Sequence, residues 1–122
     1  ELFADIVFLR PLGLRLDTYD LIILDPPKFA SSHYHVDRAA RAYKDINLNG
    51  LRLLRAGGQL LTFSCSGAID TDLFQKIVAG AVIDARRQAW ALTRFGAGVD
   101  HPLLMTFPEG EYLKGLHLKL CD

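Results

Sequence analysis

The apolar positions of the chain fall into short runs that end at polar clusters. Residues 19–24 (YDLIIL) are almost continuously apolar and stop at Asp25-Pro26-Pro27. A run of this kind is typical of a strand buried on both faces of a parallel sheet, and it must end there because proline cannot donate to a sheet ladder. Residues 59–63 repeat the pattern and stop at Ser64-Cys65-Ser66-Gly67. We therefore predict two buried strands, each followed by a polar cluster.

Helical spacing fills the segments between these runs. Residues 36–55 have one largely apolar side, formed by Tyr43, Asn47, Gly50, Leu51 and Leu54. We expect this helix to stop at Gly57-Gly58. A second helix begins where Asp70 or Thr71 can cap it and fades near residues 86–87.

The last third of the chain predicts two more strands. Residues 89–95 form one, and residues 112–120 form another in which leucines alternate with His117 and Lys119. No helix separates these two strands, which predicts an antiparallel hairpin. The first nine residues are ambiguous between the end of a strand and the start of a helix. The whole order indicates an α/β fold with a mostly parallel sheet and a terminal antiparallel strand.

Composition narrows the function classes. The 122 residues carry no formal net charge, so a contact with nucleic acid must come from a local patch or from another domain. No apolar run approaches the roughly 20 residues of a membrane helix. The two cysteines, Cys65 and Cys121, do not make a disulfide framework. We expect a cytoplasmic protein without membrane contact.

The two polar clusters are the candidate site. Ligands of open α/β sheets bind beyond the carboxyl ends of the strands, so neighbouring strands would bring Asp25 close to Cys65. A simple turn at Asp25-Pro26-Pro27 and a buried structural thiol at Cys65 are the alternatives. Arg38 and Arg41 lie at the end of the first helix nearest the crevice, although such a cationic face is usually only solvated surface. His33 and His35 lack further ligands nearby in sequence, so we expect no metal.

Several motifs together resemble a known family. They are Asp25-Pro26-Pro27-Lys28-Phe29, residues 41–47 (RAYKDIN), residues 61–67 (LTFSCSG), residues 72–77 (DLFQKI), Asp100-His101-Pro102 and residues 108–115 (PEGEYLKG). In this order they are similar to the C-terminal part of bacterial 23S ribosomal RNA cytosine-C5 methyltransferases of the RlmI type. The resemblance covers roughly residues 1–120.

The resemblance implies the C-terminal half of a Rossmann-like class I methyltransferase sheet that uses S-adenosyl-L-methionine. Residues 1–122 would be the C-terminal portion of the catalytic domain. The Gly-rich cofactor loop, the ribose-binding acid and the N-terminal RNA-binding domain of the family are not in this stretch. Asp25 would end the fourth strand and Cys65 the fifth, while Asp5 matches the adenine-contacting acid. Asp5, Asp25 and Pro26 are thus the expected cofactor-binding residues.

A cysteine nucleophile suits this chemistry. Cytosine C5 is a poor nucleophile until a thiolate adds to C6, and Cys65 is the only well-placed cysteine. Asp25 would hydrogen-bond the base. The expected contacts to the RNA substrate come from Pro27, Lys28, Phe29, Arg38 and Arg41, with Phe29 stacking on the base. Lys28 stands where many RNA cytosine-C5 enzymes have a second cysteine, which leaves the base that removes the C5 proton open.

Two other functions remain open from the sequence. Asp-Pro-Pro-aromatic motifs also bind exocyclic amines in N-methyltransferases, which need no thiol. The chain could instead serve only in binding or assembly. We also expect these 122 residues to be inactive alone and to self-associate as a homodimer, because residues 21–24 would form an open, apolar sheet edge.

Overall fold

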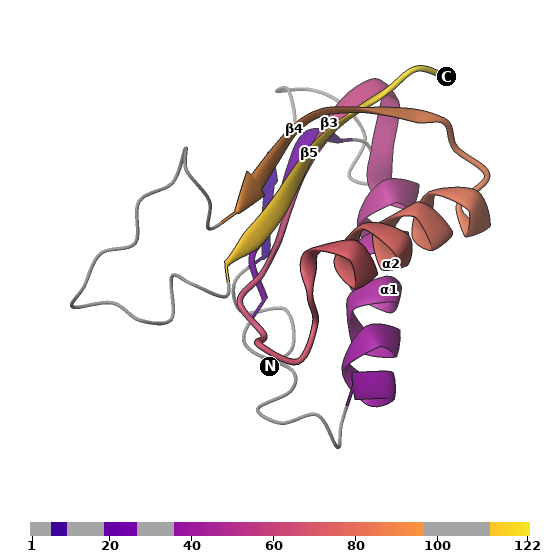
Figure 1. Cartoon of the computed structure of the whole chain (residues 1–122). Coiled ribbons are helices and arrows are strands. Elements are labelled where there is room, and N and C mark those ends of the chain that lie inside the picture. The colour runs from indigo at the N-terminus through magenta and orange to yellow at the C-terminus, as the bar shows by residue number, and fades with distance from the viewer. Residues whose placement is uncertain (1–5, 10–18, 27–35, 97–112) are drawn as a thin grey trace.

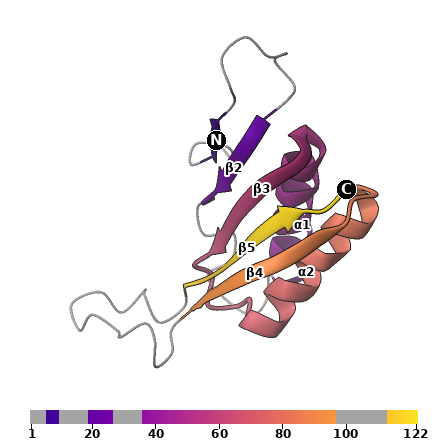
Figure 2. The same ribbon diagram turned by 90° about the horizontal axis from the view of Figure 1, so that it is seen from above.

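The computed structural model describes residues 6–9, 19–26, 36–96 and 113–122, which form one sheet and two helices. The strands are β1 (Ile6–Leu9), β2 (Tyr19–Leu24), β3 (Leu54–Ser64), β4 (Ala89–Gly96) and β5 (Lys114–Leu120). The helices are α1 (Val36–Leu53) and α2 (Thr71–Asp84). Both helices pack on the same face of the sheet (Figures 1 and 2).

The sheet has the order β1-β2-β3-β5-β4. β2 and β3 are parallel neighbours, whereas β5 runs antiparallel to both β3 and β4. The α/β class and the antiparallel hairpin of β4 and β5 are therefore confirmed. The last strand does not close the sheet at its edge, however, because β5 lies between β3 and β4 (Figure 2).

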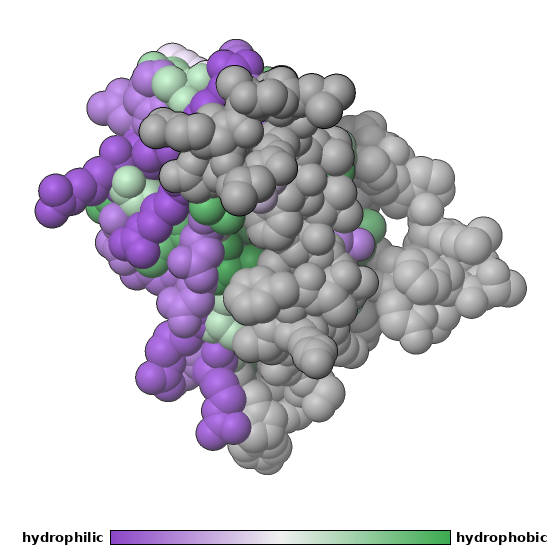
Figure 3. Space-filling model, turned by 180° about the vertical axis from the view of Figure 1, so that it is seen from behind, coloured by the Kyte–Doolittle hydropathy of each residue, from purple (hydrophilic) through white to green (hydrophobic). Residues whose placement is uncertain are grey.

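The helix-covered face holds the core. Ile22 and Leu24 of β2 are buried against α1, and a Cβ at Gly50 would lie 3.2 Å from Leu24 Cδ1. The side of α1 predicted to be apolar is the buried one. Tyr43 of α1 meets Phe74 of α2 edge to face, with ring centroids 5.9 Å apart. On the side where the helices lie, hydrophilic side chains project outward (Figure 3).

The predicted boundary between the first helix and the next strand was wrong by several residues. α1 ends at Leu53 and β3 begins at once, so both glycines lie inside the strand. Gly57 has a φ of +76°, a conformation that glycine adopts without strain. The register against β2 jumps there, from Tyr19 opposite Leu54 to Leu21 opposite Gln59. A bulge in the strand therefore uses the glycines that were expected to stop the helix.

The second helix begins as predicted. Asp70 is its N-cap, and its Oδ1 accepts a hydrogen bond of 2.7 Å from the Leu73 amide. The helix ends at Asp84, and Arg86 then takes a left-handed conformation with a φ of 58°. Arg87 donates to Leu51 O in the last turn of α1 and to Leu54 O at the start of β3.

A close approach explains Gly115 in β5. A Cβ at this position would overlap the ring of Phe63 on β3 and lie 3.2 Å from Thr62 O. The rings of Phe63 and Phe95 lie 5.8 Å apart, on strands that flank β5. Any larger residue at position 115 would have to displace an aromatic ring.

The expectation of an open edge at β2 was wrong. β1 pairs antiparallel with β2 along residues 21–24, from Ile6 opposite Leu24 to Leu9 opposite Leu21. The backbone groups that were expected to join two copies are thus paired within the chain. The predicted edge-to-edge dimer loses its physical basis. In the described residues, neither helix is long and apolar enough to cross a membrane.

Candidate active site

The site lies at the end of the sheet where the parallel strands β2 and β3 finish, which we call its carboxyl edge. β2 and β3 run in parallel, with Leu24 opposite Thr62, so their carboxyl ends meet at this edge. Asp25 and Pro26 follow β2, and Cys65 follows Ser64 at the end of β3. Asp25 is exposed and Pro26 is buried. The structure thus brings Asp25, Pro26 and the cluster around Cys65 to the end of the sheet where open α/β sheets bind ligands.

Cys65 lies between the end of β3 and a turn that begins at Ser66. It is half-buried, between the fully buried Ser64 and Ser66. The Ser66 amide donates to Ser64 Oγ at 3.2 Å, and the Ile69 amide donates to Ser66 O at the same distance. The second cysteine, Cys121, is exposed and follows the last residue of β5 at the opposite edge. The two thiols therefore sit in different environments.

A buried lysine lies at the same end of the sheet as Cys65. Lys114, the first residue of β5, lies opposite Ser64 on β3 and Gly96 on β4. It is only 5% exposed, and its Nζ donates to Ser66 O at 2.9 Å. The lysine thus holds the carbonyl of the residue that follows Cys65. Sequence reasoning did not single out this residue as part of the site.

The buried environment of Lys114 disfavours the protonated, positively charged form of its side chain. Burial lowers the pKa of the Lys114 ammonium below the usual value for lysine. Cys65 and Asp70 act in the opposite direction, because negative charge on either group favours the protonated amine. Among the described residues, no carboxylate lies within ion-pair distance of Lys114. The groups that favour its charge are therefore Cys65 and the N-cap of α2.

The predicted RNA-contacting arginines lie at the start of α1, and both are exposed. A helix that follows a parallel strand begins at the carboxyl edge of that strand, which places Arg38 and Arg41 on the same side as the site. Arg41 Nε makes one weak contact, 3.5 Å to Asp37 O. Both guanidinium groups face solvent, as either an RNA contact or a plain solvated surface would require.

Some predicted residues lie outside the described part of the chain. They are Asp5, Pro27, Lys28 and Phe29, together with the histidines His33 and His35. In the described segments, no three histidine, cysteine or acidic side chains gather as a metal site would need.

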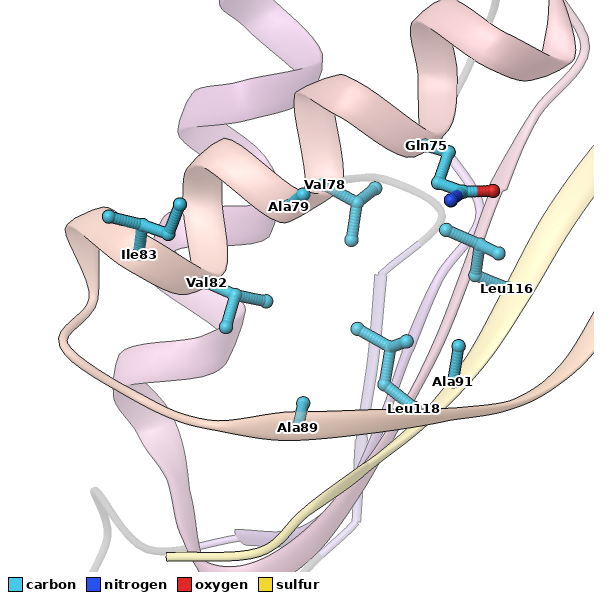
Figure 4. A pocket seen from close by; sticks show the side chains of 9 residues that line it. All are labelled: Gln75, Val78, Ala79, Val82, Ile83, Ala89, Ala91, Leu116 and Leu118. Atoms are coloured by element: carbon cyan, nitrogen blue, oxygen red, sulfur yellow. The ribbon is translucent and has the colours of Figure 1, made fainter.

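A hollow whose lining does not include Cys65 lies between α2 and the strands β4 and β5 (Figure 4). Its volume is about 280 Å³, and it is lined by Gln75, Val78, Ala79, Val82, Ile83, Ala89, Ala91, Leu116 and Leu118. Gln75 is the only polar side chain in this set. A reaction needs polar groups that orient the substrate, so we place the candidate site at the carboxyl edge and not here.

Comparison with known proteins agrees with the sequence motifs. The chain is 54% identical over 99 residues to ribosomal RNA large subunit methyltransferase I of Shewanella frigidimarina, which covers 81% of this chain and 25% of that protein. It is 50% identical over 104 residues to the protein of the same name from Alteromonas mediterranea, covering 85% and 26%. No family model matches the chain. The resemblance to these methyltransferases is confirmed.

Solved structures agree with the fold of these methyltransferases. SMU.776, assigned as a methyltransferase and solved in complex with SAH, matches 84% of this chain with a TM-score of 0.62 and 23% identity. A protein from Streptococcus mutans assigned as SAM-dependent matches the same share with a TM-score of 0.56. The match covers about a quarter of each of those chains. At this identity the likeness supports the fold alone.

Proposed function

We propose that the complete protein transfers a methyl group from S-adenosyl-L-methionine to C5 of a cytosine in 23S ribosomal RNA. Residues 1–122 would be the C-terminal portion of its catalytic domain. The chain spans about a quarter of the length of the curated relatives it matches, whose name specifies ribosomal RNA of the large subunit. On this proposal the Gly-rich cofactor loop and the RNA-binding domain belong to other parts of the protein, and these residues alone are inactive.

The observation that carries the proposal is the placement of Cys65. A half-buried thiol stands at the carboxyl end of β3, at the same edge as the exposed carboxylate of Asp25. Most free cysteines are inert members of a core. This one lies between two serines, outside any strand or helix. A nucleophile needs such a position to reach a base.

In the proposed reaction, the Cys65 thiolate adds to C6 of the cytosine and forms an Sγ–C6 bond. C5 thereby gains the electron density that it needs to accept a methyl group. A base then takes the proton from C5, and the Sγ–C6 bond breaks to regenerate the thiolate. Asp25 hydrogen-bonds the N3 and N4 edge of the base during these steps. Pro27, Lys28, Phe29, Arg38 and Arg41 are the proposed contacts to the RNA.

The cofactor would supply an electrophilic methyl group on a sulfonium, and the S–CH3 bond would break as C5 takes the methyl group, leaving a neutral thioether. An exposed carboxylate at the carboxyl edge suits a ligand that carries positive charge, so Asp25 fits the rim of such a site. Pro26 is buried directly behind it and would stiffen the backbone there. Asp5 is the proposed contact to the adenine.

Replacement of Cys65 tests the proposal. In the complete protein, Cys65→Ala should abolish methyl transfer while cofactor binding persists. Cys121→Ala is the matched control, because it removes the exposed thiol at the opposite edge, and it should leave activity unchanged. RNA that contains 5-fluorocytosine should trap the wild type covalently, since fluorine at C5 blocks the release of the thiolate. The Cys65→Ala protein should form no such adduct.

The opposite results would point elsewhere. A Cys65→Ala protein with full activity would contradict the adduct and would favour methylation of an exocyclic amine. A complete protein that binds neither cofactor nor RNA would favour a role in assembly.

A further inference from the structure

We propose that Lys114 is a positioning residue for Cys65, fixing its turn through Ser66 O and stabilising its thiolate by charge. The inference rests on the proposed function, in which Cys65 is the nucleophile. It concerns a residue on another strand, 49 positions away in sequence. Lys114 is brought to the site because β5 is inserted directly beside β3.

The first argument is the place of Lys114 in its strand. Lys114 has the same orientation as Leu116, Leu118 and Leu120, the three buried leucines of β5. An apolar residue would continue this series without cost. Burial of an ammonium is instead unfavourable unless other groups repay the lost hydration. A lysine at this position therefore needs a compensating interaction.

The second argument is which groups supply that compensation. The single hydrogen bond of Lys114 that the described residues show goes to Ser66 O, which is a neutral acceptor. The groups that favour its charge are Cys65 and Asp70. The Asp70 side chain is already engaged as the cap of α2, with Oδ1 on the Leu73 amide. The effect of Cys65 is the larger of the two, and the hydrogen bond to Ser66 O holds the ammonium next to the residue that follows the thiol.

The proposed reaction places negative charge on Cys65 Sγ at two steps, and a nearby cation would stabilise both. Cys65 must lose its proton to solvent before Sγ can bond to C6, and negative charge returns to Sγ when that bond breaks. A cation fixed beside the turn stabilises the sulfur anion at both moments. Lys114 forms no covalent bond, and its hydrogen bond to Ser66 O keeps the turn in place throughout.

Lys119 provides a matched control on the same strand. Its Nζ also donates to a backbone carbonyl, Gly57 O, at the same distance of 2.9 Å. Lys119 is exposed and lies opposite Gln59, toward the other end of β5. The two lysines differ in burial and in proximity to Cys65 but share the type of hydrogen bond.

The experiment compares Lys114→Gln with Lys119→Gln in the complete protein. Glutamine removes the charge but keeps a donor for the carbonyl. The readout is the rate of alkylation of Cys65 by iodoacetamide at pH 7, measured by peptide mass spectrometry with Cys121 as the internal reference. We expect Lys114→Gln to slow the alkylation of Cys65 by about tenfold, the order of effect of losing one neighbouring opposite charge. Lys119→Gln should leave the rate unchanged.

A folded Lys114→Gln protein in which Cys65 reacts at the wild-type rate would overturn the inference. If that variant does not fold, the alkylation rates of Cys65 and Cys121 in the wild-type protein provide the test. Cys65 is half-buried and Cys121 exposed, so accessibility alone makes Cys65 the slower thiol. Faster alkylation of Cys65 supports the inference, and slower alkylation overturns it.

Enzyme kinetics separate this inference from the proposed function. Lys114→Gln should lower kcat for methyl transfer with little change in KM for the RNA, since Lys114 does not touch substrate. If Cys65→Ala retains activity, the proposed function fails, while the alkylation rates still report the effect of Lys114 on the thiol. If Cys65→Ala is inactive and Lys114→Gln alters neither kcat nor alkylation, only the role of Lys114 is lost.

Discussion

Basic side chains have different surroundings at the two ends of the sheet, where β2 and β3 begin and where they finish. At the edge where β2 and β3 begin, Arg55 pairs with Asp20, and Arg87 Nε pairs with Asp122 at 2.7 Å. Arg87 also donates to two carbonyls, Leu51 O at the end of α1 at 2.6 Å and Leu54 O at the start of β3 at 2.9 Å. At the edge where the same strands end, Lys114 is more deeply buried and contacts a carbonyl beside a thiol.

The difference separates stability from chemistry. Paired charges and capped carbonyls at the first edge tie the end of α1 to the end of β5, so their net effect is structural. At the second edge a buried cation lacks a carboxylate within ion-pair distance in the described residues. A fold gains little from that arrangement, whereas the proposed reaction would use a cation beside Cys65. Substitutions at the two edges should therefore change different measurements.

The largest expected effect is at the reactive edge. Asp25→Asn keeps the size of the side chain and removes its charge. In the complete protein we expect turnover to fall by a factor on the order of 10² or more, because a positioned acid-base group is lost. The melting temperature should stay close to that of the wild type. A clear loss of thermal stability with retained activity would instead support a purely structural turn at Asp25.

A smaller effect is expected at the opposite edge. Arg87→Met keeps much of the length of the side chain and removes its hydrogen bonds to Asp122 and to the end of α1. We expect the free energy of unfolding to fall by about 2 kcal/mol, a typical value for charged hydrogen bonds. Urea denaturation measures this change. Methyl transfer, assayed well below the melting temperature, should be unaffected. Lost activity in a folded Arg87→Met protein would break the division between the edges.

The smallest effect is a pH dependence of the same contact. The hydrogen bond from Arg87 holds the pKa of Asp122 below the ordinary value of 3.8. A carboxylate with a depressed pKa stabilises the fold above its unfolded pKa, and this contribution is lost as the pH falls through the folded pKa. The stability difference between wild type and Asp122→Asn should thus be about 1 kcal/mol or less at pH 7. It should shrink steadily below about pH 4, as urea titrations at several pH values would show. A constant difference would exclude this linkage.

Local pattern determined most of the elements in the described residues. The apolar run of β2, the buried side of α1 and the Asp70 cap of α2 follow from residue spacing and side-chain chemistry within a few positions. The ends of strands followed too, since Pro26 and the polar turn after Ser64 stop a sheet ladder. For the same reason, the sequence placed Asp25 and Cys65 at the ends of strands, whereas the pairing of β2 with β3 was decided by the sheet.

Contacts between distant segments decided the rest. Gly57 looked like a helix stop but serves a bulge in β3, because pairing with β2 outweighs a local signal. β1 pairs with the strand edge of β2 that appeared open, and no residue within β2 predicts this pairing. Lys114 carried a faint signal, a charge in the series of buried leucines of β5. Its position next to Cys65 depends on the insertion of β5 beside β3. Pairing between strands so far apart in sequence is set by the packing of the whole sheet, because no local preference of either segment specifies its partner.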